Sequence, residues 1–164
     1  MKEQCLIIPQ HLLQRIIEHC LDEKPIEACG ILTGRDGRVL HAFATDNSKR
    51  SPFYYEVDHA QQRLVLQGME KRGEQVVGIY HSHPTSPAVP SSTDIRMAVH
   101  YPDAYRVIVS LDGPTDVRAY LIKNGKARRV KLYAPVDAGG EWHDLRGSIK
   151  CTGADWPDSD GSLR

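Results

Sequence analysis

The sequence predicts a mixed α/β domain of the α+β kind, with a mainly antiparallel sheet flanked by helices. Amphipathic segments with helical spacing alternate along the chain with short segments rich in β-branched and apolar residues. Asp-Gly and Asn-Gly turns separate several of the apolar segments, and such turns join antiparallel neighbours. The chain has 164 residues, the size of one ordinary domain.

Three segments have the pattern of helices. Residues 10–23 place apolar side chains at helical spacing and stop just before Pro25. Residues 58–73 begin with Asp58, a favourable N-cap residue, and end on a glycine. Residues 91–103, which follow a proline-rich loop, predict a short third helix.

The apolar segments between these helices predict strands. They are residues 29–34, 38–45, 74–83, 105–111, 116–123 and 126–133. The Asp-Gly turn between the first two predicts a hairpin, and the turns between the last three predict an antiparallel meander. The expected order is therefore helix, two strands, helix, strand, helix, three strands.

The composition changes near residue 134. Residues 1–134 form the expected folded domain, whereas residues 135–164 are rich in Gly, Asp and Ser and lack sustained periodicity. We expect a partly ordered C-terminal tail, with Trp142 or Trp156 holding it to the domain.

Charge and hydropathy exclude several classes of function. Lys plus Arg and Asp plus Glu both total 21, so no net field attracts nucleic acid or an anionic membrane surface. No apolar run approaches the roughly 18 residues that a membrane span needs, and the N-terminal apolar stretch ends at Pro9. We therefore predict a cytoplasmic protein with no nucleic acid or membrane partner. The four cysteines form no CxxC pair, which predicts free thiols.

His81 and His83 are candidate metal ligands. They are separated by one residue at the end of a predicted strand, so both side chains project from the same face. Asp94 follows a proline-rich loop that could fold its carboxylate back to the same point, and His₂Asp plus water is an open site typical of catalytic zinc. Each fragment also has an ordinary interpretation: HxH as a surface feature, and SxxD as a helix cap with Ser91 or Ser92.

The run HSHPTSPAVPSSTD contains these residues in the order HxHPx₆SxxD. This pattern resembles the JAMM signature of the MPN-plus (Mov34/MPN/PAD-1) metalloproteases, in which a distant glutamate precedes HxHP and SxxD. Glu27, in the segment EACGILTG, matches that glutamate. The resemblance extends from residue 10 to about residue 133 and implies the cytidine-deaminase-like MPN fold.

The resemblance implies a role for each motif residue. His81, His83 and Asp94 are expected to hold one Zn²⁺ per chain, which lowers the pKa of a bound water to around 7 and polarises a carbonyl. Glu27 is expected to act as the base that takes the proton of this water and returns it to the leaving amine. Ser91 is expected to donate to the oxyanion, with helix capping as its alternative role.

The spacing after the motif favours one branch of the family. Only about ten residues separate Asp94 from the strand at Tyr105, which leaves no room for the long insertion of eukaryotic deubiquitinases. The chain is more similar to small bacterial enzymes that cut after the C-terminal Gly-Gly of a ubiquitin-like sulfur-carrier protein, for example to release cysteine. Residues 46–57 are the expected wall of the substrate groove, or else an ordinary surface loop.

Two other functions stay open: a deubiquitinase-like isopeptidase, and a noncatalytic interaction module that retains zinc. A metal-dependent deaminase is disfavoured because its PCxxC ligand set is absent from the sequence. The sequence carries no signal for an oligomeric state. The remaining histidines lack motif spacing, and we leave them out of the metal site: His11, His19, His41, His59, His100 and His143. We expect His143, in the tail, to be solvated.

Overall fold

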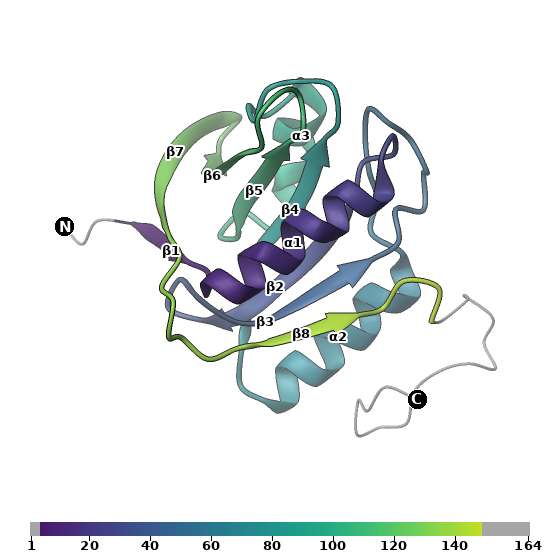
Figure 1. Ribbon diagram of the computed structural model, residues 1–164. Helices are drawn as coiled ribbons and strands as arrows, with labels where there is room; N and C mark the ends of the chain where they lie inside the picture. Colours follow the sequence, from purple (N-terminus) through teal and green to yellow (C-terminus); the bar gives the residue numbers. More distant parts are fainter. Residues whose placement is uncertain (1–3, 149–164) are drawn as a thin grey trace.

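A computed structural model describes residues 4–148 of the chain as one mixed sheet with helices on both faces (Figure 1). The helices are α1 (Gln10–Glu23), α2 (His59–Lys71), α3 (Ser92–Met97) and a 3₁₀ turn at Ala98–His100. The strands are β1 (Cys5–Ile7), β2 (Cys29–Arg35), β3 (Arg38–Thr45), β4 (Gln75–His83), β5 (Tyr105–Ser110), β6 (Asp116–Lys123), β7 (Lys126–Tyr133) and β8 (Glu141–Asp144).

The strands lie in the order β1-β7-β6-β5-β4-β2-β3-β8. The pairs β2–β3, β2–β4, β5–β6 and β6–β7 are antiparallel, whereas β4 and β5 run parallel. Strand β1 pairs with β7 and also, through Ile7 and Arg38, with β3, so it joins two distant parts of the sheet. This order places β4, which carries the HxH pair, in the interior of the sheet between β2 and β5.

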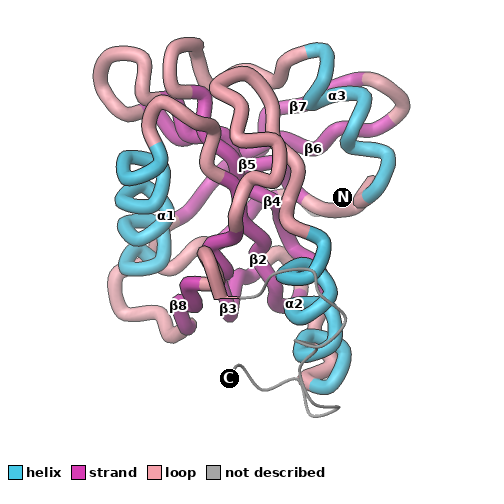
Figure 2. Tube along the Cα trace, turned by 90° about the vertical axis from the view of Figure 1, so that its right-hand side faces the viewer, coloured by secondary structure: helices cyan, strands magenta, loops and turns pink. Residues whose placement is uncertain are grey.

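Helices α1 and α2 cover opposite faces of the sheet, as the side view in Figure 2 shows. Helix α1 buries Leu12, Ile16 and Cys20 in the larger apolar cluster. Helix α2 packs Leu64 and Val65 against a second cluster on β2 and β3. Because apolar side chains cover β2 from both sides, its first six residues are all buried.

The predicted turns have the backbone geometry that their sequences favour. Asp36 and Gly37 both have positive φ, 51° and 74°, and so do Asn124 and Gly125, at 53° and 74°. Two consecutive left-handed residues make the tight hairpin turns for which Asp-Gly and Asn-Gly are suited. The Asp58 side chain accepts a hydrogen bond from the Gln61 backbone N–H and so caps α2 as expected.

The predicted mixed α+β fold is confirmed, with differences in two strands and one helix. Strands β1 and β8 were not expected, and both join the sheet in parallel. The third helix is shorter than residues 91–103, since its α-helical part ends at Met97. None of the helices in residues 4–148 is long and apolar enough to cross a membrane.

The expected tail begins with an ordered strand. Residues 141–144 form β8 along the edge of β3, and Trp142 packs against the larger apolar cluster. The expectation that His143 is solvated was wrong, because its side chain is 24% exposed and stacks on Phe43. Trp156 and Cys151 lie outside the described residues.

Candidate metal centre

His81 and His83 end β4, and both side chains are buried. They point to the same side of the sheet because successive strand residues alternate between faces. Ser82, between them, projects to the other side, where its Oγ accepts a hydrogen bond of 2.8 Å from the Ala28 N–H. This hydrogen bond joins the residue before β2 to the end of β4, between the two histidines.

Three side chains donate hydrogen bonds to backbone carbonyl groups of the loop that follows His83. His83 Nδ1 donates to Pro87 O at 2.8 Å, and the Ser110 hydroxyl donates to Ser86 O at 2.7 Å. The Tyr120 hydroxyl donates to Ala88 O at 2.6 Å. These contacts direct the chain back toward β4, so that α3 begins beside the two histidines.

Asp94 is oriented by a capping box with Ser91. The Asp94 N–H donates to Ser91 Oγ at 3.0 Å, and the Ser91 N–H donates to Asp94 Oδ2 at 2.9 Å. The same Oδ2 lies 3.2 Å from His81 Nε2 and 3.1 Å from His83 Nε2. Burial alone would raise the pKa of Asp94, but the two histidines hold it well below its usual range.

These three side chains, which we call the β4 cluster, fit a zinc ion. The two Nε2 atoms are 3.1 Å apart, so the three donor atoms form a triangle with sides of 3.1 to 3.2 Å. In tetrahedral zinc sites with bonds of about 2.0 Å, ligand atoms are about 3.3 Å apart. Because His83 Nδ1 donates to a carbonyl, the neutral ring leaves Nε2 free as a ligand.

Glu27 lies beside this cluster, immediately before the residue that pairs with Ser82. Its backbone N–H donates to Ser51 O at 2.9 Å, and Asn47 Nδ2 donates to its carbonyl at 3.0 Å. The side chain is buried, and its Oε2 has no hydrogen-bond partner in the protein. Burial raises the pKa of Glu27 to about 8, with smaller opposing effects of His83 and Asp94. A buried carboxyl with an unsatisfied oxygen needs a partner that the protein itself does not supply.

Ser91 keeps both of the roles considered for it. Its oxygen accepts the Asp94 N–H as a helix cap, which leaves the hydroxyl proton available for another acceptor. Capping is therefore observed, and donation to a substrate oxygen stays a prediction.

A pocket of about 440 Å³ reaches the β4 cluster at Asp94. Its walls include Tyr54 and Tyr55 from the loop expected to border the substrate groove, together with the buried Arg106. The Tyr55 ring stacks on His81 with a centroid separation of 4.5 Å. Sequence reasoning missed Tyr55 and Arg106, because neither belongs to a motif with recognisable spacing.

Residues 9–123 match the family model described as prokaryotic homologs of the JAB domain. The chain belongs to this family. Among the JAB relatives, the "CysO-cysteine peptidase" of Mycobacterium tuberculosis is 38% identical over 124 residues, covering 73% of this chain and 84% of the relative. The "Desampylase" of Pyrococcus furiosus is 34% identical over 103 residues, covering 63% and 73%.

A solved structure of another protein has a fold similar to that of this JAB chain. It is the solution structure of a protein from Desulfitobacterium hafniense, with a TM-score of 0.72 and 28% identity. The match covers 82% of this chain and 94% of that protein. The match to the family model confirms the expected JAMM/MPN-type family, and the structural match confirms the fold class.

Proposed function

We propose that this JAB chain is a zinc-dependent peptidase that cuts after the C-terminal Gly-Gly of a ubiquitin-like sulfur-carrier protein. In this proposal His81, His83 and Asp94 hold one zinc ion, and Glu27 and Ser91 act on the substrate. The observation that carries the proposal is the buried Glu27 carboxyl, which has no protein partner and lies next to a His₂Asp cluster.

The presence of Glu27 favours a hydrolytic site over a structural zinc site. A structural zinc site needs only its ligands. An additional buried carboxyl that has no hydrogen-bond partner lowers the stability of the fold. A hydrolytic site needs a group that can hold a proton and release it. Burial raises the pKa of Glu27 to about 8, and a neighbouring cation lowers a carboxyl pKa again, toward the range suited to that task.

Each residue then has a distinct part in hydrolysis. Zinc in such a site polarises a carbonyl and makes water acidic enough to lose a proton near pH 7. Glu27 accepts the proton of the attacking water and passes it to the amide nitrogen as the C–N bond breaks. The Ser91 hydroxyl donates to the carbonyl oxygen as negative charge develops there.

In this proposal the substrate tail runs along the pocket and not along β4. Strand β4 is paired on both sides, so a substrate tail cannot add to it as a further strand. The tail instead passes along the pocket wall formed by Tyr54, Tyr55 and Glu56. Glycines suit such an approach because they lack the side chain that would hold the backbone away.

The names of two relatives support this substrate class. One name states cleavage between CysO and cysteine, which is the kind of reaction proposed here, release of an amino acid from a carrier. The name "Desampylase" supports the alternative of an isopeptidase that removes a small protein from a conjugate.

Mass spectrometry of two parallel reactions tests the proposal. The chain is incubated with a sulfur carrier that bears one amino acid after its Gly-Gly, and separately with lysine-linked diubiquitin. We expect release of the amino acid and slow or no cleavage of diubiquitin, because the segment between Asp94 and β5 is too short for an insertion that would hold two ubiquitins. Efficient diubiquitin cleavage beside an untouched carrier would show that the isopeptidase alternative is correct.

A further inference from the structure

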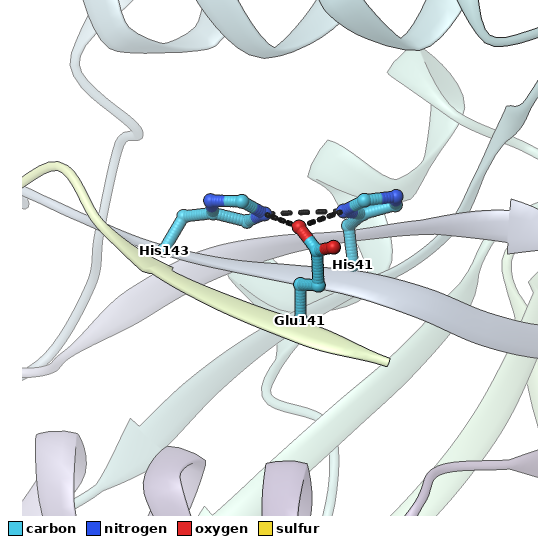
Figure 3. A group of neighbouring side chains, drawn as sticks. All are labelled: His41, Glu141 and His143. Carbon is cyan, nitrogen blue, oxygen red and sulfur yellow. Dashed lines mark hydrogen bonds and ion pairs between the residues drawn. The ribbon is translucent and has the colours of Figure 1, made fainter. Parts of the chain in front are cut away.

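A second group of metal-binding side chains lies where β8 meets β3. His41 Nδ1 is 3.1 Å from His143 Nε2, and both nitrogens are 3.7 to 3.8 Å from Glu141 Oε2. Figure 3 shows the two ring nitrogens pointing at each other, with the Glu141 carboxylate oxygen against both. We call His41, Glu141 and His143 the β8 cluster.

The strand register explains why these three side chains converge. In the parallel pairing of β3 with β8, Glu141 lies opposite His41 and His143 lies opposite Phe43. Residues two apart on a strand share a face, so His41 and Phe43 project together, as do Glu141 and His143. The His143 ring stacks on Phe43 at 4.6 Å between centroids, which restricts its orientation.

The donor geometry resembles that of the β4 cluster. Sides of 3.1 to 3.8 Å bracket the spacing of about 3.3 Å between ligands in a tetrahedral zinc site. Two imidazoles and a carboxylate are ligands that zinc and similar divalent transition metals accept. The Glu141 side chain is 70% exposed, so solvent reaches the cluster and an ion can enter.

The Glu74 carboxylate favours the His41 tautomer that can bind a metal. The Glu74 side chain is 4% exposed, and its Oε2 lies 3.4 Å from His41 Nε2. A carboxylate at this nitrogen favours the tautomer with the proton on Nε2, which leaves Nδ1 as a ligand toward His143. The Thr33 hydroxyl and Arg72 Nε donate to the same carboxylate and fix its position.

We propose that the β8 cluster is a second metal site, which takes Zn²⁺ or a similar divalent transition-metal ion and clips β8 to β3. Two ligands come from β8 and one from β3, so the bound ion joins strands that are about one hundred residues apart in the sequence. Because the ion binds only when both strands are in place, it stabilises the docked strand.

This site is separate from the β4 cluster. On β2, which lies between β3 and β4, Thr33 pairs with His41 and Cys29 pairs with His81. The step from Cys29 to Thr33 corresponds to about 13 Å along a strand. An ion in the β8 cluster therefore shares no ligand with the β4 cluster, and its presence can be tested without reference to the proposed peptidase activity.

Zinc counting in a variant that lacks the β4 ligands isolates the β8 cluster. The full chain carrying His81→Ala and His83→Ala is stripped with a chelator, supplied with Zn²⁺ and desalted, and its bound zinc is measured by elemental analysis. We expect one zinc per chain in this variant and two in the unaltered chain. Co²⁺ in place of Zn²⁺ should give the visible absorption of a tetrahedral site.

Removal of a β8 ligand should abolish this remaining zinc. Glu141→Gln is the main test, because the side chain is exposed and the change keeps its shape; His143→Ala is the second test. His100→Ala, at an exposed histidine outside both clusters, is the matched control and should keep one zinc. Hydrogen exchange at residues 141–144 should slow on zinc addition, except in the Glu141→Gln chain.

Two results would overturn the proposal. One is the absence of zinc in the chain that lacks His81 and His83, which would leave His41 and His143 as an ordinary hydrogen-bonded pair. The other is one bound zinc that persists after both Glu141→Gln and His143→Ala.

Discussion

The β4 cluster and the β8 cluster contain the same ligand types, two imidazoles and one carboxylate, but their carboxylates differ in environment. Asp94 is 8% exposed and is fixed by a capping box, whereas the Glu141 side chain is 70% exposed at the sheet edge. The fold fixes the Asp94 carboxylate in place, whereas the Glu141 side chain would lose conformational freedom on binding the proposed ion.

Each cluster has a further carboxylate beside it, Glu27 or Glu74, and these two differ in their hydrogen-bond partners. Beside the β4 cluster, Glu27 has a buried oxygen without a hydrogen-bond partner, as the proposed role of proton acceptor from water requires. Beside the β8 cluster, Glu74 is engaged by Thr33, Arg72 and His41, so it can only orient a ligand. The two clusters therefore share a donor set that suits the same metals, and they differ in whether the neighbouring carboxylate is already engaged by protein groups.

The largest expected effect is that of His83→Ala. It removes one of three ligands from the β4 cluster, so we expect loss of that zinc and of all measurable cleavage of the carrier. His143→Ala removes a chemically equal ligand from the β8 cluster and should leave the cleavage rate unchanged. Elemental analysis and a cleavage assay on both variants check this. If the two variants lost activity equally, the division of roles between the clusters would be wrong.

A smaller effect is expected from Ser91→Ala, which removes both the cap and the proposed oxyanion donor. We expect a rate lowered about 10² to 10³-fold, as for other oxyanion donors. Ser91→Gly is the control, since glycine spares most of the cap, at a cost of a few tenths of a kcal/mol against about 1 kcal/mol for alanine. Equal rate losses with unequal unfolding free energies would support the donor role. A rate that recovers in the glycine variant would assign Ser91 to capping alone.

His19 separates the effect of burial from that of metal ligation, because it is a buried histidine in neither cluster. Burial, aided by Arg146, lowers its pKa from 6.5 to about 4. Between these values the unfolded chain binds a proton that the folded chain does not. Stability is therefore full above pH 6.5 and falls as the pH drops toward 4.

Urea unfolding at pH 7 and pH 5 measures this effect. We expect His19 to account for about 2 kcal/mol of the stability lost between the two values. His19→Gln, which cannot titrate, should lose that much less over the same range. Equal losses in the two chains would show that the His19 pKa is not lowered in the folded protein.

The smallest effect should come from the pocket wall that adjoins the β4 cluster. Tyr54 is 48% exposed and lines the pocket but lies outside the chemistry. We expect Tyr54→Ala to raise KM about three- to tenfold with kcat nearly unchanged, and Tyr54→Phe to change neither. A lower kcat with an unchanged KM would place Tyr54 in the catalytic step instead.

The sequence predicts the β4 cluster well because its signals are local. An HxH pair at a strand end, a short loop and a capping sequence each have a characteristic pattern, and the loop is short enough to bring Asp94 back to His81. The helix at residues 10–23 and the turns at Asp36-Gly37 and Asn124-Gly125 were predictable for the same reason.

What the sequence does not reveal depends on contacts between distant segments. Strand β1 has three residues and β8 has four, which is too short for periodicity, and each forms by pairing with a strand far away in the chain. His143 was expected to be solvated because nothing near it in sequence signals Phe43 as a packing partner. The β8 cluster was missed with it, since His41 and Glu141 converge only through that strand pairing.

The most direct test is one substitution made at each cluster, Glu27→Gln and Glu141→Gln. Both exchange a carboxylate for an amide of the same shape, and bound zinc and carrier cleavage are measured for each chain. We predict that the Glu27→Gln chain keeps the β4 zinc. It should cleave the carrier about 10² to 10⁴-fold more slowly, as expected for loss of a general base. We predict that Glu141→Gln loses only the β8 zinc and cleaves at the original rate. A Glu27→Gln chain that cleaves the carrier at the original rate would contradict the account.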